Sequence, residues 1–257
     1  MTMVIAGDDA RFAYLSEILR EEGTDVKRMT CPEDLENAEA VLSRYPFTGE
    51  TEAALKAFAP KAKWILLPAG EIPETLKTER KVISLLDDTG FVNENAYLTA
   101  EGAISAAMRD APFALSGARV MVVGYGRIGR ALTEMLVGLR ARVFVCSRRE
   151  GGRLSAMARG ASAVSPEGMK TELPDSRVIF VTSPDRVLAR DALSYVSRRA
   201  FLYDLSSAPY GMDLESALQM GLNARREPAL PGRYCPESAA KCMARAILRM
   251  QNAEEAE

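Results

Sequence analysis

The sequence predicts an α/β protein made of two Rossmann-type, doubly wound parallel-sheet domains joined by a linking helix. Three observations predict this class. The chain has 257 residues, of which 47% are hydrophobic, enough for two cores. Short apolar runs alternate with segments of helical spacing in both halves. A glycine-rich turn follows an apolar run in the second half. We therefore expect an N-terminal α/β substrate or partner domain at 1–98, a linking helix at 99–113, a dinucleotide-binding domain at 114–230 and a C-terminal helix at 231–257 that returns to the first domain.

The first domain is expected to alternate strands and helices. Apolar runs that end in Gly or Pro turns predict strands, and apolar residues spaced three or four apart predict helices. The expected strands are 3–7, 25–29, 39–46, 63–70 and 81–88, and the expected helices are 10–23 and 50–60. The first strand leads into "GDDAR" rather than into a three-glycine turn, so this half is not required to bind a nucleotide.

The second domain follows a linking helix that Thr99 is expected to open as its N-cap, in "TAEGAISAAMRDA". The same periodicities then apply. The expected strands are 119–124, 142–147, 178–183 and 200–207, and the expected helices are 127–140, 152–160 and 236–257. The last helix should pack on the first domain before an acidic tail.

Composition excludes several classes of function. A formal charge of -2 and a pI near 5.6 argue against nucleic acid or a membrane surface as the main partner. We expect a cytoplasmic chain, because no leader or membrane-spanning run is recognisable. Four scattered cysteines indicate neither a metal site nor disulfides. The chain has no histidine, which excludes His-dependent mechanisms unless another chain supplies that residue.

The glycine-rich turn predicts a dinucleotide site. Gly124 suits the tight turn, Gly126 lets the backbone approach a pyrophosphate, and Gly129 permits close packing of helix and strand. Tyr125, Arg127 and Ile128 complete the segment, whose helix-terminal amides would face the phosphates. The alternative is a glycine turn that binds nothing.

Cofactor choice depends on the end of the next strand. NAD-binding folds place an acidic residue there to bind the ribose hydroxyls, whereas this chain has Ser147, Arg148 and Arg149. A hydroxyl and guanidinium groups suit a 2′-phosphate, so we expect NADP, with NAD possible. The alternative is a solvated basic loop.

Four segments in this order resemble the first of the two subunits of dipicolinate synthase: "NENAYLTAEGAISAAM", "VMVVGYGRIGRAL", "YDLSSAPYGMD" and "EPALPGRYCPESAA". The resemblance implies NADP-linked oxidation of a dihydrodipicolinate-type intermediate of the lysine pathway to dipicolinate. It implies the flavoprotein-like second subunit of dipicolinate synthase as partner, a role in sporulation and a location in the mother cell. We also expect a homo-oligomer. The chain departs from the family pattern at Glu237 and Ser238, where the family has Lys and Thr.

A second departure concerns the strand end that reads Asn-Thr-x-Pro in the family. Here it is Thr182, Ser183 and Pro184, which we include among the cofactor-binding residues.

A dicarboxylate substrate needs cationic or amide donors at both ends, and residues after strands or at helix starts are the candidates. The catalytic candidates are Thr99, Glu101, Ser206 and Ser207, and the substrate-binding candidates are Arg11, Thr48, Gly49 and Arg233. Each also has an ordinary interpretation, as a helix cap, a turn residue or a solvated arginine.

The reaction implied by the resemblance needs no strong catalytic base. Conversion of a dihydropyridine to an aromatic ring is strongly downhill, so the chain mainly has to align the substrate with the nicotinamide. Two other functions remain open. One is a dehydrogenase of another amino- or imino-dicarboxylic acid, with a pocket altered around Glu237. The other is a cofactor-holding regulatory subunit without catalysis.

Overall fold

The computed structural model describes residues 1–43, 49–58, 62–68 and 81–255, and divides the chain into two compact units. Unit 1 is Met1–Asn95 together with Pro231–Glu257, and unit 2 is Ala96–Leu230. The described helices include none with the length and apolarity required to cross a bilayer. Because unit 1 contains both ends of the chain, its core is built from segments far apart in the sequence.

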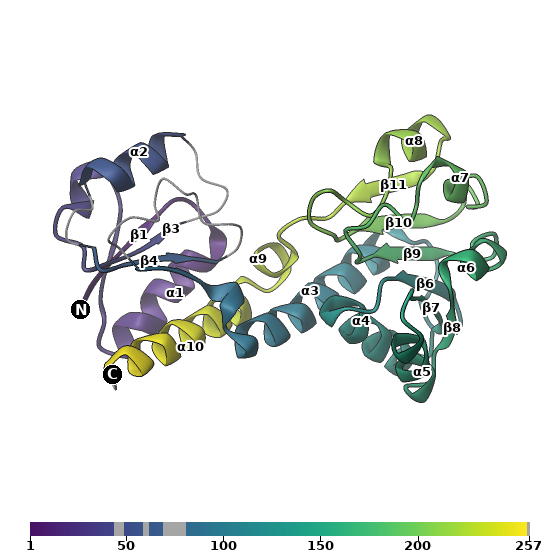
Figure 1. The fold of residues 1–257 in the computed structure, drawn as a ribbon, viewed down its shortest axis with the longest axis horizontal. Coiled ribbons are helices and arrows are strands. Elements are labelled where there is room, and N and C mark those ends of the chain that lie inside the picture. Colours follow the sequence, from purple (N-terminus) through teal and green to yellow (C-terminus); the bar gives the residue numbers. More distant parts are fainter. Residues whose placement is uncertain (44–48, 59–61, 69–80, 256–257) are drawn as a thin grey trace. The chain divides into compact units, whose positions relative to one another are not determined.

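Unit 1 contains a parallel sheet of five strands in the order β2-β1-β3-β4-β5 (Figure 1). The register pairs Met3 of β1 with Val26 on one side and Ala40 on the other. The strands are β1 Thr2–Ala6, β2 Asp25–Arg28, β3 Ala40–Ser43, β4 Trp64–Leu67 and β5 Lys81–Ser84. The helices are α1 Ala10–Glu21, α2 Gly49–Phe58, α9 Leu230–Tyr234 and α10 Pro236–Glu255, with 3₁₀ turns η1 at Pro32–Leu35 and η3 at Leu85–Asp87.

Helices α1 and α10 pack against each other in unit 1 (Figure 1). The buried residues Phe12, Leu15 and Leu19 recur at helical spacing on α1, and Met243 and Ile247 do so on α10. The C-terminal helix thus returns to the first domain.

The helix expected to begin at Thr99 begins ten residues earlier. Helix α3 spans Thr89–Asp110, and the Asp88 carboxylate accepts a hydrogen bond of 2.5 Å from the Phe91 amide, as an N-cap does. The prediction of Thr99 as a helix start was wrong. Polar residues at 93–95 conceal the periodicity, but Phe91, Ala96 and Ala100 are buried and continue one helix.

Unit 2 contains a parallel sheet of six strands in the order β11-β10-β9-β6-β7-β8, which is the order of a doubly wound dinucleotide-binding fold. The strands are β6 Arg119–Val123, β7 Arg142–Cys146, β8 Ser162–Val164, β9 Val178–Val181, β10 Phe201–Asp204 and β11 Asn223–Arg226. The helices are α4 Arg127–Gly138, α5 Glu150–Ala158, α6 Pro166–Glu172, α7 Arg190–Leu193 and α8 Leu214–Gln219. The predicted fold class is confirmed.

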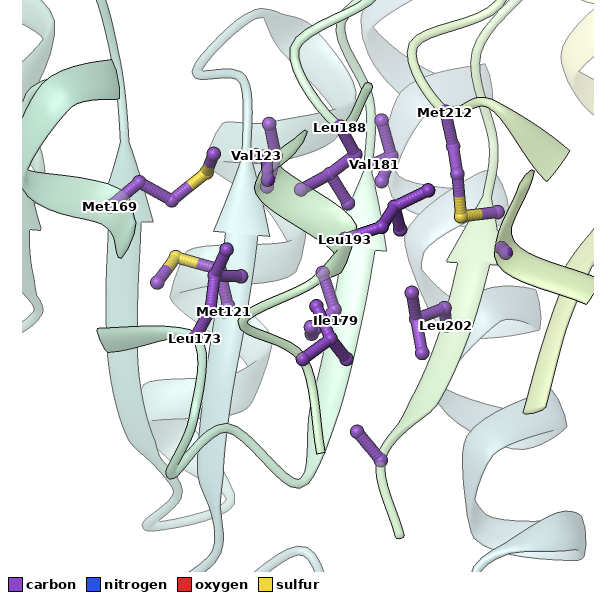
Figure 2. Packing of buried hydrophobic residues seen from close by; sticks show 14 of the residues in the cluster. Met121, Val123, Met169, Leu173, Ile179, Val181, Leu188, Leu193, Leu202 and Met212 are labelled. Carbon is purple, nitrogen blue, oxygen red and sulfur yellow. The ribbon is translucent and has the colours of Figure 1, made fainter. Parts of the chain in front are cut away.

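One face of this sheet carries a hydrophobic core (Figure 2). Met121, Ile179 and Leu202 point from three neighbouring strands toward Met169 of α6 and Leu193 of α7. The sequence did not predict α6, α7 and α8, nor the edge strands β8 and β11. Edge strands pair on one side only and need no continuous apolar run, as "NARR" in β11 shows.

Candidate dinucleotide site

A pocket of about 400 Å³ lies at the carboxyl ends of β6, β7 and β9. Strand order reverses between β6 and β9, and ligands of doubly wound sheets bind at such a point. The lining residues are Val123, Gly124, Tyr125, Gly126, Cys146, Ser147, Arg148, Arg149, Pro166, Thr182, Ser183, Pro184, Asp185 and Val187. The predicted glycine turn, serine–arginine loop and β9 end are thus brought together in one pocket.

The glycines of the turn have different steric surroundings. Gly124 has a φ of 104°, and a Cβ there would lie 2.6 Å from Thr182 Oγ1. A Cβ on Gly129 would collide with the Gly124 carbonyl oxygen, so this glycine allows α4 to pack on the turn. A Cβ on Gly126 would meet nothing within 4 Å. Of these three glycines, Gly126 is therefore the one that faces open space at the pocket.

Two observations fit a bound dinucleotide. Gly126 precedes α4 and provides no side-chain cap, so the first-turn amides of that helix remain for an anion. The Tyr125 side chain is buried in the pocket lining, and its hydroxyl has no hydrogen-bond partner within the described part of the chain. Arg127, Ile128 and Gly129 form the first turn of α4 and do not line the pocket.

The loop after β7 carries the predicted phosphate-binding group. The Ser147 amide donates to the Val164 carbonyl at 3.1 Å, which fixes the loop to β8. Arg149 is exposed and has no carboxylate partner among the residues described. Its guanidinium is therefore available to an anion.

Arg148 is engaged across the pocket by a residue that the sequence patterns did not predict. Its Nη2 lies 2.6 Å from Asp185 Oδ2, and the same carboxylate oxygen accepts from Ser183 Oγ at 3.1 Å. The side chains of this ion pair are 67% and 49% exposed. The loops after β7 and β9 are joined by this contact, and a 2′-phosphate on Arg148 would compete with Asp185.

Arg153 is a second residue that the sequence patterns did not predict. Its Nη1 donates to the carbonyls of Ser147 and Arg148 at 2.8 and 3.0 Å. Helix α5 comes close to the loop because residue 152 is glycine, whose Cβ would lie 2.7 Å from Ser147 Oγ. Arg153 thus holds the loop in place, a role that depends on where α5 begins.

Cys146 lines the pocket but is not a nucleophile. Burial raises the pKa of its thiol to about 12, so it stays protonated at neutral pH. Within the described ranges, no group of three or more acidic or cysteine side chains is arranged to hold a metal ion.

The substrate-binding candidates of unit 1 are differently placed. Arg11 forms a two-point hydrogen bond to Asp9, with Nε and Nη2 at 2.9 and 2.6 Å from the two carboxylate oxygens. Gly232 of α9 packs on this pair, since its Cβ would lie 3.3 Å from Arg11 Nε. The adjacent Arg233 is exposed, with its guanidinium carbon 5.5 Å from the centroid of the Tyr234 ring. Thr48 lies outside the described residues, and Gly49 begins α2.

The two catalytic candidates on α3 lie on different faces of that helix. Thr99 is buried in the interior of α3, whereas Glu101 is exposed, because residues two apart on a helix point to different faces. The ordinary interpretation of Thr99 as a helix cap therefore does not hold.

The serines after β10 shape a loop. Ser206 Oγ donates to the buried Asp204 carboxylate at 2.6 Å and accepts from the Gly211 amide at 2.8 Å. Ser207 is exposed, and its carbonyl accepts from the Tyr210 amide at 2.9 Å. Ser206 therefore holds the loop closed, and of the two serines it is Ser207 that presents its side chain to solvent.

The chain is similar to two kinds of known protein, the 2-hydroxyacid dehydrogenases and dipicolinate synthase. Residues 85–202 match the family model described as the NAD binding domain of D-isomer specific 2-hydroxyacid dehydrogenases. The first subunit of dipicolinate synthase from Bacillus subtilis (strain 168) is 26% identical over 204 residues, which are 79% of this chain and 63% of that protein. The aligned part thus spans less than two thirds of that relative.

Solved structures show the same fold along the whole chain. The corresponding dipicolinate synthase subunit of Bacillus halodurans has a TM-score of 0.85 at 24% identity, covering 97% of each chain. That of Bacillus subtilis has a TM-score of 0.86 at 21% identity, covering 100% of this chain and 97% of that one. D-lactate dehydrogenase of Escherichia coli has a TM-score of 0.71 at 18% identity, covering 100% and 98%.

The matched domain and the pocket at the sheet's switch point support an oxidoreductase of the dehydrogenase type that uses a nicotinamide cofactor. In sequence and in fold, the chain resembles the first subunit of dipicolinate synthase, and residues 85–202 resemble the NAD binding domain of D-isomer specific 2-hydroxyacid dehydrogenases.

Proposed function

We propose that this chain is an NADP-dependent oxidoreductase that oxidises a dihydrodipicolinate-type intermediate of the lysine pathway to dipicolinate, together with a flavoprotein-like second subunit. The observation that carries the proposal is the likeness to the first subunit of dipicolinate synthase in both sequence and fold. By the same resemblance, the chain would act in the mother cell during sporulation. We also propose that it is cytoplasmic and forms a homo-oligomer.

The pocket of unit 2 supports the cofactor part of the proposal. The amides after Gly126 and the Tyr125 hydroxyl would hold the pyrophosphate and its neighbouring groups. Ser147 and Arg149 would hold the 2′-phosphate, and Arg153 would keep their loop in place. When bound, the nicotinamide accepts a hydride.

The chain's other task is to hold the substrate carboxylates, and Arg233 and Ser207 are the candidates with exposed side chains. Arg11 is a weaker candidate than the sequence suggests, because Asp9 already binds its guanidinium at two points. The ring loses a hydride and a proton and becomes aromatic, so water suffices as the proton acceptor in a chain without histidine.

The test combines the purified full chain with NADP and the lysine-pathway intermediate, in the presence and absence of the second dipicolinate synthase subunit from the same source. We expect dipicolinate absorbance and NADPH fluorescence to rise together. The matched control is the variant with Arg148→Ala and Arg149→Ala, which should need more NADP for the same rate.

Other outcomes would favour the other functions. NADPH formation from a different imino-dicarboxylate, with no turnover of this intermediate, would support another dehydrogenase. Cofactor binding without turnover of any such substrate, combined with a change in the activity of the second subunit, would support a regulatory role.

A further inference from the structure

Unit 2 has a second pocket, of about 430 Å³, that shares no lining residue with the dinucleotide pocket. Three arginines dominate it: Arg186, Arg190 and Arg226. The other lining residues are Met212, Asp213, Leu214, Glu215, Ser216 and Gln219. The proposed function leaves this pocket without a role.

The arginines come from three segments that the fold fixes together. Arg186 follows β9, Arg190 begins α7 and Arg226 ends β11. The segment of Arg186 and Arg190 is bound to the other wall of the pocket, because the Leu188 amide donates to the Gly211 carbonyl and the Asp213 amide to the Leu188 carbonyl, both at 3.0 Å. Backbone hydrogen bonds therefore hold the segment of Arg186 and Arg190 beside the Met212 and Asp213 side of the pocket.

Arg226 is oriented by an aromatic ring. Its guanidinium carbon lies 3.8 Å from the centroid of the Tyr210 ring. Stacking uses the flat face of the guanidinium and leaves the N–H groups along its edge for hydrogen bonds.

The carboxylates of the pocket do not occupy these guanidiniums. Among the residues described, none of the three arginines is in an ion pair within 4 Å. Asp213 accepts from the Ser216 amide and hydroxyl at 3.1 and 3.0 Å, and these bonds are the main cause of its lowered pKa, with attraction from Arg186 and Arg190 added. Glu215 accepts from Gln219 at 3.3 Å. Positive charge therefore exceeds negative charge in the pocket, and the cationic donors remain open.

We propose that this pocket is an anion site for a small molecule with two or more negative groups, carboxylate or phosphate. Guanidinium groups bind both kinds of oxyanion through paired N–H donors, and three of them around one pocket suit a ligand with more than one charge. The site is separate from the cofactor pocket and does not depend on the proposed function.

The test is a calorimetric titration of the full chain at low ionic strength, with saturating NADP present throughout to fill the first pocket, and with inorganic pyrophosphate in one arm and pyridine-2,6-dicarboxylate in the other. At least one anion should bind the native chain. The double variant Arg186→Ala/Arg190→Ala and the single variant Arg226→Gln should weaken that binding about tenfold or more. The arm that binds identifies the ligand as a phosphate or a carboxylate.

A control variant separates this site from general charge. Arg198→Ala/Arg199→Ala removes the same charge from exposed positions of unit 2 outside the pocket and should change the affinity less than about twofold. The proposal is overturned if neither anion binds at millimolar concentration, if the pocket variants bind as tightly as the native chain, or if the control weakens binding as much as the pocket variants. Thermal melting checks that every variant is folded.

Discussion

At the residue scale, we expect the loop after β7 to decide cofactor preference. Hydrogen bonds to a charged group contribute about 1–3 kcal/mol, so the native chain should bind NADP more tightly than NAD by that amount. Replacing Arg148 and Arg149 by Ala should remove most of the difference and leave NAD affinity nearly unchanged. Ser147→Asp should reverse the preference, because a carboxylate accepts from both ribose hydroxyls and repels the phosphate. Paired dissociation constants measure this, and equal affinities in the native chain would contradict it.

A further prediction for the same pocket concerns the effect of Asp185 on NADP affinity. Asp185 lies 2.6 Å from Arg148 and would compete with a 2′-phosphate for that guanidinium. Asp185→Asn should therefore raise NADP affinity, by about two- to fivefold for an exposed pair, without changing NAD affinity. Asp175→Asn is the matched control, since Asp175 is exposed and precedes β9 at the opposite edge of the sheet. An equal gain in both variants would indicate a long-range charge effect.

Gly126 and Gly129 should respond differently to added side chains. Gly126→Val should abolish cofactor binding and leave stability unchanged, because the new Cβ meets no protein atom but occupies the approach to the pyrophosphate. Gly129→Ala should destabilise unit 2 by about 1–3 kcal/mol, because its Cβ collides with the Gly124 carbonyl. Thermal melting and calorimetric titration separate the two effects. Unchanged affinity in Gly126→Val would mean that the dinucleotide does not cross this turn.

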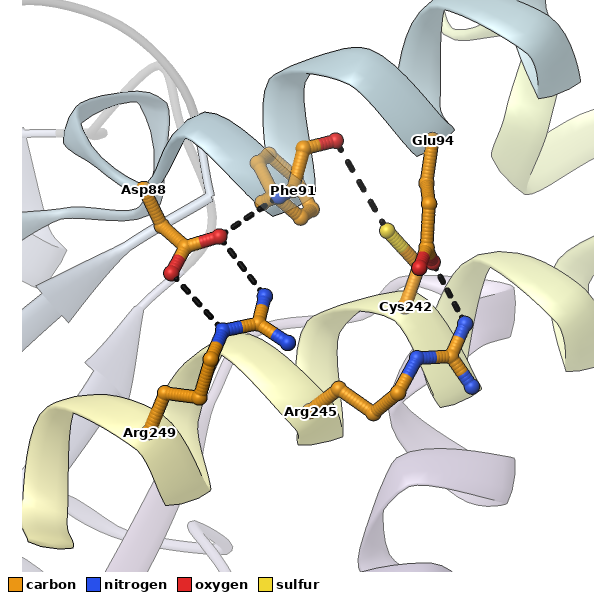
Figure 3. A network of polar contacts seen from close by, with 6 residues as sticks. All are labelled: Asp88, Phe91, Glu94, Cys242, Arg245 and Arg249. Carbon is orange, nitrogen blue, oxygen red and sulfur yellow. Dashed lines mark hydrogen bonds and ion pairs between the residues drawn. The ribbon is translucent and has the colours of Figure 1, made fainter.

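At the element scale, the start of α3 is tied to α10 by polar contacts within unit 1 (Figure 3). Asp88 accepts from Arg249 Nε and Nη2 at 3.0 and 2.7 Å, and Glu94 pairs with Arg245 at 2.5 Å. Asp88 is only 13% exposed, whereas the Glu94 pair is about half exposed on both sides, at 44% and 51%. The Asp88 contact should therefore contribute more to stability.

This difference predicts a pH dependence. The hydrogen bonds from Arg249, followed by that from the Phe91 amide, hold the pKa of Asp88 below its usual 3.8. The stabilisation is complete above the unfolded-state pKa of about 3.9 and is lost as the pH falls through the lower folded-state value. Asp88→Asn keeps a capping oxygen but loses the charge, and should cost about 1 kcal/mol at pH 7.

Urea unfolding of the full chain at pH 7 and at pH 3 tests this, followed by the fluorescence of Trp64, the single tryptophan, which lies in unit 1. The gap between native chain and Asp88→Asn should narrow at the lower pH. Glu94→Gln is the control, with an expected cost of less than about 1 kcal/mol. A gap that is the same at both pH values would show that the charge of Asp88 plays no part.

At the scale of the whole molecule, the two units should unfold in separate steps, because each has its own sheet and core. Ile247 is fully buried on α10 of unit 1, and Leu202 is fully buried on β10 of unit 2. Ile247→Ala and Leu202→Ala should each cost about 2–5 kcal/mol, in different calorimetric transitions. A single transition shifted equally by both variants would show one cooperative unit instead.

Sequence patterns predicted some secondary-structure elements of the two units and missed others. Apolar periodicity identified the central strands of both sheets, because a buried parallel strand must be apolar on both faces. The glycine spacing and Ser147–Arg149 predicted a dinucleotide site, and the glycine turn and this loop line one pocket because both lie within one βαβ unit. The edge strands β8 and β11 of unit 2 and the short helices α6, α7 and α8 left no such pattern, whereas the edge strands β2 and β5 of unit 1 were predicted.

Residue patterns alone were therefore enough to predict the fold class and the glycine turn before α4, both of which depend on local conformation or on a repeat of apolar side chains. The partners of the polar side chains were set by tertiary contacts instead. Folding paired Arg148 with Asp185, bound Arg153 to the Ser147 carbonyl, and placed Thr99 inside a helix rather than at its start. Such contacts depend on where separate loops meet in the folded chain. The sequence around a charged residue does not indicate which distant residue will become its partner.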